Sequence, residues 1–109
     1  MQLHVKGRNL EVSDSIRSYA ERKLGKLDRW INAVAEVEVE LAVEKNPSIA
    51  DNQVAEATVR LKGHTLREHS ASRDMKVSID DLVENLVRQV KEQRVKTRRF
   101  RRQTVEHES

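Results

Sequence analysis

The side chains best suited to metal binding or acid–base catalysis are four histidines and a row of three glutamates. No two histidines have the i, i+4 spacing of a helical metal site: His4, His64, His69 and His107. Glu36, Glu38 and Glu40 alternate with apolar residues, so they share the exposed face of a strand, where solvated carboxylates make poor catalytic groups. A cysteine nucleophile, a glycine-rich phosphate loop and a serine elbow are all missing. We therefore predict that the protein is not an enzyme and uses no metal, other cofactor or small-molecule substrate.

The basic residues have a pattern that favours an anionic partner. Residues 88–102 contain eight basic side chains and one acid, so this segment carries +7 in a chain of 109 residues whose net charge is +3. The remainder therefore carries −4, which indicates a partner approached from one end of the molecule. An earlier stripe of Arg22, Lys26 and Arg29, with Lys23 at its edge, is by itself more typical of a soluble surface. Taken together, the two sets favour a surface that binds phosphates.

The kind of nucleic acid follows from side chains that are missing. An RNA-binding sheet of the common four-stranded type needs aromatic residues on its open face, whereas this face carries Glu36, Glu38 and Glu40. The sequence also lacks the helix pair of a DNA recognition motif. We therefore expect the helices to bind folded RNA through its backbone and shape, without reading its base sequence.

Apolar spacings predict the elements that position these residues. Alternation near the N-terminus predicts a short strand that ends at Gly7, where the glycine allows a turn. Apolar residues at helical spacing predict a helix over residues 14–31, with Ser13 capping its first turn. Strict alternation over residues 33–44 predicts the clearest strand of the chain.

The second half of the chain predicts a hairpin followed by a long helix. Residues 55–61 alternate again after a turn-rich loop, and Gly63-His64 offers a tight turn that would place Glu68 opposite Val59. Because this register turns Glu68 inward, we expect a bulge or an edge strand there. A final helix begins near Asp74, and its apolar stripe fades in the second half, which should project beyond the core.

These elements define the expected fold and domain organisation. Their order predicts an α+β protein, a β-α-β-β-β-α two-layer sandwich in which a four-stranded sheet, expected to be antiparallel, carries two helices on one face. We expect one domain over residues 1–98 and a basic, flexible C-terminal tail over residues 99–109. The absence of cysteine, of an apolar run long enough to span a membrane and of an apolar N-terminal segment favours a cytoplasmic protein.

Several segments have the order and spacing of motifs from one known family. These segments are Gly7-Arg8-Asn9-Leu10-Glu11-Val12-Ser13-Asp14, Lys23-Leu24-Gly25-Lys26-Leu27, Val43-Glu44-Lys45, Asp74-Met75, Ile79-Asp80 and Leu86-Val87-Arg88-Gln89-Val90. Over about residues 2–99 the chain resembles the ribosome hibernation-promoting and ribosome-associated inhibitor proteins, also labelled sigma-54 modulation proteins. The segments of the last helix are the most specific part of this resemblance.

The resemblance implies a function and a site. Members of this family bind the small ribosomal subunit, through its 16S rRNA, in the channel that messenger RNA and the A-site and P-site tRNAs occupy, and so block translation. Residues 1–98 would then be the ribosome-binding domain, monomeric away from the ribosome. Carried over by position, the RNA-binding residues are Lys23, Lys26, Arg88, Arg94 and Lys96. Charge alone adds Lys91, Arg98 and Arg99.

The sequence departs from the family pattern at a few positions. Lys76 stands where the family often has tyrosine, Glu92 where a basic residue is common, and Glu68-His69 where a small residue and an acid are usual. The family also has short members and long members with a C-terminal dimerising domain, which residues 1–109 lack. Both a short form and the N-terminal domain of a long form fit the sequence.

Two other functions fit the same residues. One is a protein-interaction module whose last helix pairs with an acidic protein or with itself. The other is a general double-stranded RNA-binding domain, since such domains share the core of two helices and three strands. Salt-sensitive RNA binding would favour the ribosomal function over the first, and a preference for intact small subunits would favour it over the second.

Overall fold

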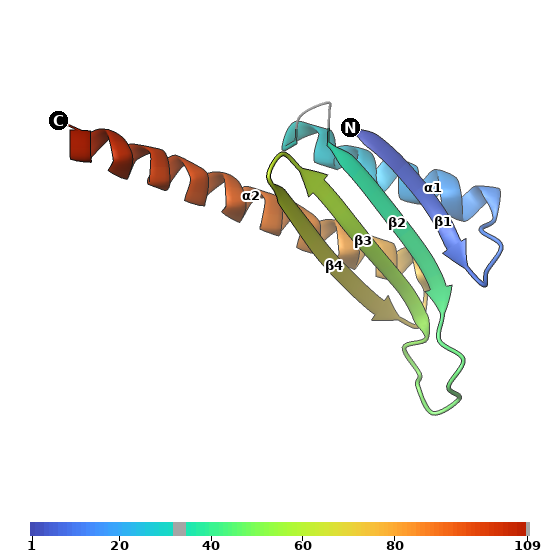
Figure 1. Cartoon of the computed structure of the whole chain (residues 1–109). Helices are drawn as coiled ribbons and strands as arrows, with labels where there is room; N and C mark the ends of the chain where they lie inside the picture. Colours follow the sequence, from blue (N-terminus) through green and yellow to red (C-terminus); the bar gives the residue numbers. More distant parts are fainter. Residues whose placement is uncertain (32–34, 109) are drawn as a thin grey trace.

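Alternating apolar residues form a four-stranded sheet in the computed structural model, which describes the backbone of residues 1–31 and 35–108 and the side chains of residues 1–31 and 35–93 (Figure 1). The strands, in their spatial order, are β1 (Gln2–Arg8), β2 (Glu36–Val43), β3 (Gln53–Leu61) and β4 (His64–Ser72). The helices are α1 (Asp14–Leu24), the short 3₁₀ helix η1 (Gly25–Arg29) and α2 (Met75–Glu108). This order confirms the predicted β-α-β-β-β-α fold.

The sheet is mixed, so the expectation of an antiparallel sheet is wrong for one pair of strands. β1 pairs in parallel with β2, which places Val5 opposite Val39. The β2–β3 and β3–β4 pairs are antiparallel. Between β1 and β2 the chain passes through α1, and a strand reached by such a crossover runs in the same direction as the strand before it.

The turn after β1 depends on Asn9 rather than on Gly7. Gly7 lies within β1, and Asn9 adopts a left-handed φ of 52° at the end of the strand. An asparagine tolerates this conformation better than most residues. Gly7 is required for a different reason, because a Cβ atom there would lie 1.9 Å from the carbonyl oxygen of Leu10.

The β3–β4 hairpin turns at Lys62-Gly63, one residue earlier than expected, and the φ of its glycine is 74°. The earlier turn places Glu68 opposite Ala57 rather than Val59. Glu68 does lie on an edge strand, as expected, and the register of the two strands runs without a bulge. Its carboxylate accepts a hydrogen bond from Gln89 of α2, which satisfies this inward-facing acid.

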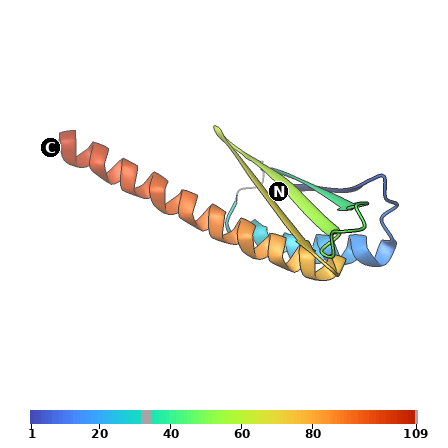
Figure 2. The ribbon, with the colours of Figure 1, turned by 90° about the horizontal axis from the view of Figure 1, so that it is seen from below.

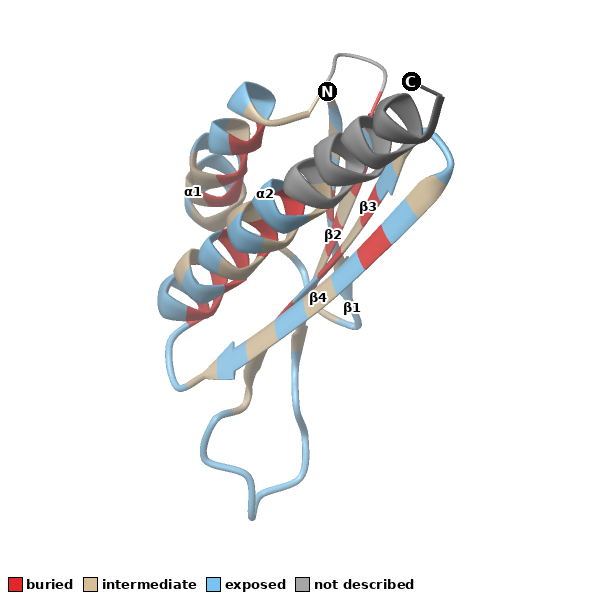
Figure 3. Ribbon diagram, turned by 90° about the vertical axis from the view of Figure 1, so that its left-hand side faces the viewer, coloured by how far each residue is buried: buried red, intermediate tan, exposed pale blue. Residues whose placement is uncertain are grey.

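Both helices pack on one face of the sheet, as predicted (Figures 2 and 3). Leu24 of α1 and Ile79 and Leu86 of α2 are completely buried against the inward-facing strand residues. Ser13 caps α1 as expected, since its Oγ accepts a hydrogen bond of 3.2 Å from the amide of Ile16. The apolar spacing of the sequence therefore identified the core-facing surface of each element.

Some element boundaries differ from the predicted ones. The helix expected over residues 14–31 is α1 followed by η1, because the chain tightens to a 3₁₀ helix at Gly25, a common way for a helix to end. The strand expected over residues 33–44 begins at Glu36. Residues 32–34 lie outside the described part of the chain.

α2 begins close to the expected position and continues well past the sheet. The Asp74 carboxylate accepts a hydrogen bond of 2.9 Å from the amide of Lys76, so it caps the first turn. The second half of the helix projects beyond the sheet, as predicted (Figures 1 and 2). Its backbone continues to Glu108; the division into a domain of residues 1–98 and a tail of residues 99–109 stays a prediction.

Candidate nucleic-acid interface

The surface between α1 and α2, here called the seam, carries four of the eight predicted basic residues; the two helices lie side by side in Figure 3. On the side of α1 and η1 it is formed by Tyr19, Lys23, Lys26 and Trp30, and on α2 by Lys76, Asp80, Val87, Arg88 and Lys91. Residues spaced three, four or seven apart share one stripe of a helix, and both sets have this spacing except for Arg88, which is offset by one position. The seam is therefore encoded locally in each helix and completed by their packing.

One end of the seam is organised by the Tyr19 hydroxyl. It donates a hydrogen bond of 2.7 Å to Oδ1 of Asp80, and Nζ of Lys23 lies 3.7 Å from the same oxygen. The hydrogen bond to Asp80, together with partial burial and the negative charge of that carboxylate, raises the pKa of Tyr19 above its ordinary value of 10.0. Lys23 is thereby held over the tyrosine ring, with Nζ 5.4 Å from the ring centroid.

The other end of the seam is organised by Trp30, directly after η1. Nζ of Lys91 lies 4.4 Å from the centroid of the Trp30 ring, which is well within the range of a cation–π contact. Arg88, one turn earlier on α2, is held by a hydrogen bond of 2.6 Å from its guanidinium to Oδ1 of Asn85. Both cations are thus oriented by neighbouring side chains.

A hollow opens between these two ends. It is lined by Lys26, Val83, Glu84, Val87, Arg88, Lys91 and Glu92. The valines supply an apolar floor, and the charged residues form a rim on which three bases outnumber two acids. Glu92, noted as a departure from the family pattern, lies on this rim. The floor of the hollow offers apolar contact but no reactive group, and its rim offers charged groups of both signs.

The structure places four of the eight predicted site residues at the seam: Lys23, Lys26, Arg88 and Lys91. The other four occupy the projecting half of α2, and their side chains lie outside the described residues: Arg94, Lys96, Arg98 and Arg99. Residues 94–102 contain six basic residues and no acid, so the positive charge of the chain rises along α2 beyond the seam. The contacts of all eight residues with RNA stay a prediction.

Sequence reasoning missed Tyr19, Trp30 and Asp80, which position the seam lysines. A signal for the two aromatic residues was present, because they lie four residues before Lys23 and four residues after Lys26 on the same helical stripe. Asp80 had no such signal, since its role appears only once the two helices are packed together.

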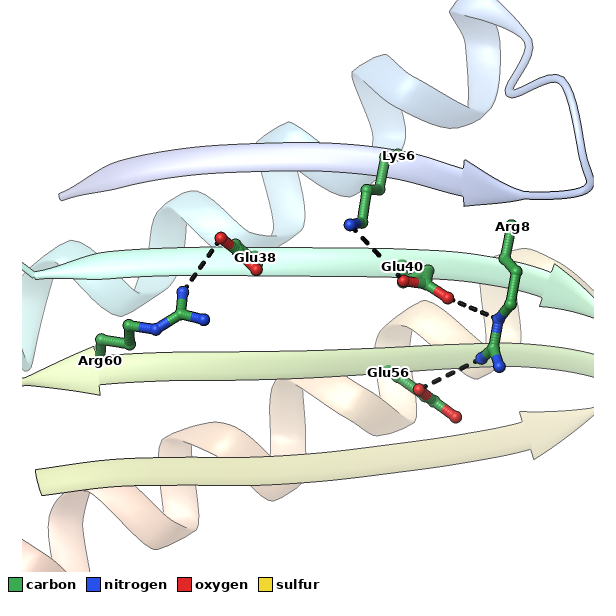
Figure 4. A network of polar contacts seen from close by, with 6 residues as sticks. All are labelled: Lys6, Arg8, Glu38, Glu40, Glu56 and Arg60. Atoms are coloured by element: carbon green, nitrogen blue, oxygen red, sulfur yellow. Dashed lines mark ion pairs between the residues drawn. The ribbon is translucent and has the colours of Figure 1, made fainter.

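Most charged side chains on the opposite, open face of the sheet are paired (Figure 4). Arg8 lies 2.5 Å from Glu40 and 3.3 Å from Glu56, and Lys6 lies 3.7 Å from Glu40. Arg60 similarly lies 3.0 Å from Glu38. The glutamates remain partly exposed to solvent, as predicted, and in addition they pair with basic residues on neighbouring strands.

The same face carries no excess of either charge among the described residues. By strand alternation its charged side chains are Lys6, Arg8, Arg60 and Arg67, with Glu36, Glu38, Glu40 and Glu56. Four bases and four acids leave this surface without net charge. The sheet is thus unlike the seam, where basic side chains adjoin a helix whose extension is strongly positive.

The described residues also bear on two other features, metal sites and membrane-spanning helices. Among them, no group of three or more histidine and acidic side chains is arranged to hold a metal ion. Within the same residues, none of the helices combines the length and apolar character needed to cross a membrane.

Known proteins resemble the chain over most of its length. Residues 3–98 match the family described as Sigma 54 modulation protein / S30EA ribosomal protein. The Lactococcus lactis ribosome hibernation promotion factor is 35% identical over 109 residues, which cover 96% of this chain and 56% of that protein. The Salmonella typhimurium ribosome hibernation promoting factor is 32% identical over 90 residues, which cover 83% of this chain and 90% of that protein. The chain thus spans just over half of the first relative and most of the second.

Solved structures with the same fold agree with the family match of residues 3–98. The crystal structure of the Thermus thermophilus Protein Y N-terminal domain matches with a TM-score of 0.71 and 34% identity, over 84% of this chain and 98% of that one. A ribosomal subunit interface protein from Coxiella burnetii matches with a TM-score of 0.72, over 87% of this chain and 99% of that one; at 21% identity it supports the fold alone. The match of residues 3–98 to the family, together with these relatives, shows that the chain belongs to the Sigma 54 modulation protein / S30EA ribosomal protein family.

Proposed function

We propose that this protein is a cytoplasmic ribosome hibernation factor that binds the small ribosomal subunit and blocks translation. Two relatives named for ribosome hibernation support the biological role. The observation that carries the proposal is the seam, where Lys23, Lys26 and Lys91 from separate elements line one surface beside the basic extension of α2. The paired charges of the sheet face leave the helices as the side suited to RNA.

The proposed mechanism is occlusion held by charge. The basic residues of the seam and of α2 would contact phosphates of 16S rRNA in the channel for messenger RNA and for the A-site and P-site tRNAs. Because such contacts release counterions, each of them makes the affinity fall more steeply as the salt concentration rises. No chemical step is needed, since a bound protein excludes the ligands of the channel by its volume.

Sedimentation with purified small ribosomal subunits over a salt series tests this proposal, with naked duplex RNA as a control ligand. A variant that removes four basic residues carries Arg88→Gln, Lys91→Gln, Arg94→Gln and Lys96→Gln. A charge-matched control removes four basic residues from loops and the sheet edge: Lys45→Gln, Lys62→Gln, Arg67→Gln and Arg73→Gln. Thermal unfolding of both variants checks that the fold is intact.

We expect the wild-type protein and the control to sediment with subunits at salt concentrations that release them from duplex RNA, and to inhibit cell-free translation. The α2 variant should remain folded and lose both properties. Equal binding to subunits and duplex RNA would instead indicate a general RNA-binding domain. Self-association without RNA binding would indicate a protein-interaction module, and unchanged binding by the folded α2 variant would overturn the charge mechanism.

A further inference from the structure

Three basic side chains surround a single aromatic ring at the Tyr19 end of the seam. Cζ of Arg22 and Nζ of Lys23 each lie 5.4 Å from the ring centroid of Tyr19, and Nζ of Lys76 lies 5.3 Å from it. Because all three charged atoms lie within 5.4 Å of the same ring centroid, the distance between any two of them is at most twice 5.4 Å. Arg22 and Lys23 come from α1, whereas Lys76 comes from the first turn of α2, so the cluster exists only in the folded protein.

The acids near this cluster neutralise only part of its charge. Asp80 lies 3.7 Å from Nζ of Lys23 and accepts the Tyr19 hydroxyl. The carboxylate of Asp74 is hydrogen-bonded to the backbone amide of Lys76, where it caps α2. Among the side chains that the structure describes, neither Arg22 nor Lys76 has a carboxylate within ion-pair distance. Two cations thus lie beside the ring without an ion pair among the described side chains.

Such a cluster has a physical use. Like charges held close together repel one another, and cation–π contacts with a half-exposed ring offset only a small part of this repulsion. An anion that contacts two or more of the cations would reduce the repulsion and gain charge-assisted hydrogen bonds. Because the cations are already gathered around Tyr19, little ordering would be needed when the anion binds.

We propose that Arg22, Lys23 and Lys76 form a binding site for a phosphate of the RNA backbone, in which Tyr19 is the positioning residue. This inference rests on the proposed function, and it adds Arg22 and Lys76 to the predicted contacts. Lys76 and Lys91 are separated by fifteen residues of α2, which corresponds to about 22 Å of helix. The contact surface would therefore run along the whole seam and not only along its Trp30 end.

Affinity for small ribosomal subunits, measured at several salt concentrations, tests the site. The test variant carries Arg22→Gln and Lys76→Gln, both exposed residues off the apolar stripe. The charge-matched control carries Lys45→Gln and Lys62→Gln, which are exposed in loops on other parts of the surface. Loss of this one phosphate contact should weaken binding and make the slope of log affinity against log salt shallower by about 0.7 to 0.9. The control should keep the wild-type slope.

The role of Tyr19 is tested by two further substitutions. Tyr19→Phe keeps the ring and should keep the wild-type salt slope. Tyr19→Leu removes the ring, releases the cations and should give a slope between those of the wild type and the double variant. The slope reports phosphate contacts, so a residue with a merely structural role would change stability without changing it.

The outcomes separate this inference from the proposed function. A variant with Arg88→Gln and Lys91→Gln serves as the reference for the other end of the seam. If it weakens subunit binding while the variant lacking Arg22 and Lys76 behaves like the control, the Tyr19 site is refuted and the proposed function stands. If the wild type does not bind subunits, the proposed function fails. NMR titration with a short RNA duplex then decides on the site: amide signals around Tyr19 that shift in the wild type but not in the double variant support it, and signals that stay fixed overturn it.

Discussion

Replacing two glycines by alanine should change the stability of the protein in opposite directions. At Gly7 an added Cβ would lie 1.9 Å from the carbonyl oxygen of Leu10 and 3.1 Å from a methyl group of Val12. At Gly25 it would meet no atom within 4 Å, and the backbone there has a helical φ of −57°. The same methyl group is therefore forced into backbone at one position and accommodated at the other.

The magnitudes follow from these contacts. Gly7→Ala must move the turn that leads into α1, and such overpacking costs about 2 kcal/mol or more. Gly25→Ala should stabilise the fold by about 0.5 kcal/mol, because alanine restricts the unfolded chain and favours a helical conformation. For a domain of this size, Tm should fall by roughly 8–16 °C in the first variant and rise by roughly 2–4 °C in the second.

Thermal and urea unfolding followed by circular dichroism measures both effects. Because the turn after β1 sets the position of α1, Gly7→Ala should also weaken subunit binding below the unfolding transition, whereas Gly25→Ala should not. The reasoning would be refuted by a Gly7→Ala protein as stable as the wild type. It would equally fail if both substitutions shifted Tm in the same direction.

Three further predictions concern single polar groups. Ser78→Ala should lower the free energy of unfolding by about 1–2 kcal/mol in urea titrations, because the buried hydroxyl donates a hydrogen bond of 2.6 Å to the carbonyl of Gln53; no loss would contradict this. Tyr19, the one tyrosine of the chain, should ionise above pH 10.0 by ultraviolet absorbance, and Asp80→Asn should lower its pKa, because the hydrogen bond to Asp80 is the largest cause of the shift. The stability that the protonated Tyr19 hydroxyl contributes through this hydrogen bond is fully present below pH 10.0 and is lost as pH rises through the raised pKa of Tyr19. A loss of this stability at lower pH would contradict the assignment of the shift to Tyr19. Glu40→Gln should cost less than about 1 kcal/mol, an effect that high salt should abolish if exposed ion pairs cause it.

Local patterns were predictable from the sequence because they depend on neighbours along the chain. The alternation in β2 and the cap of α1 by Ser13 each need only a few adjacent residues. The parallel pairing of β1 with β2 depends on the path of the connection through α1, which apolar alternation does not encode. The hairpin register depends on which residues flank Gly63 in the turn, and a shift by one residue changes every pair along the two strands.

The candidate site was predictable in its charge but not in its geometry. Lys23 and Lys26 were identified from their resemblance to a family motif, and the structure places both at the seam. The contacts of Tyr19 with Asp80 and of Trp30 with Lys91 join residues about sixty positions apart in the chain. Helical periodicity indicates which face each residue occupies, but it does not reveal which residue of the other helix lies opposite.

If the helices bind RNA as proposed, the ion pairs on the open face of the sheet bear on how many RNA molecules one protein can hold. Lys6, Arg8 and Arg60 would make that face cationic if their glutamate partners were absent. A protein with cationic surfaces on both sides would bridge separate RNA particles and, in excess, draw them into aggregates. With most of the sheet charges paired, the proposed site on the helices would be the single RNA-binding surface, so additional copies would fill further sites without cross-linking them.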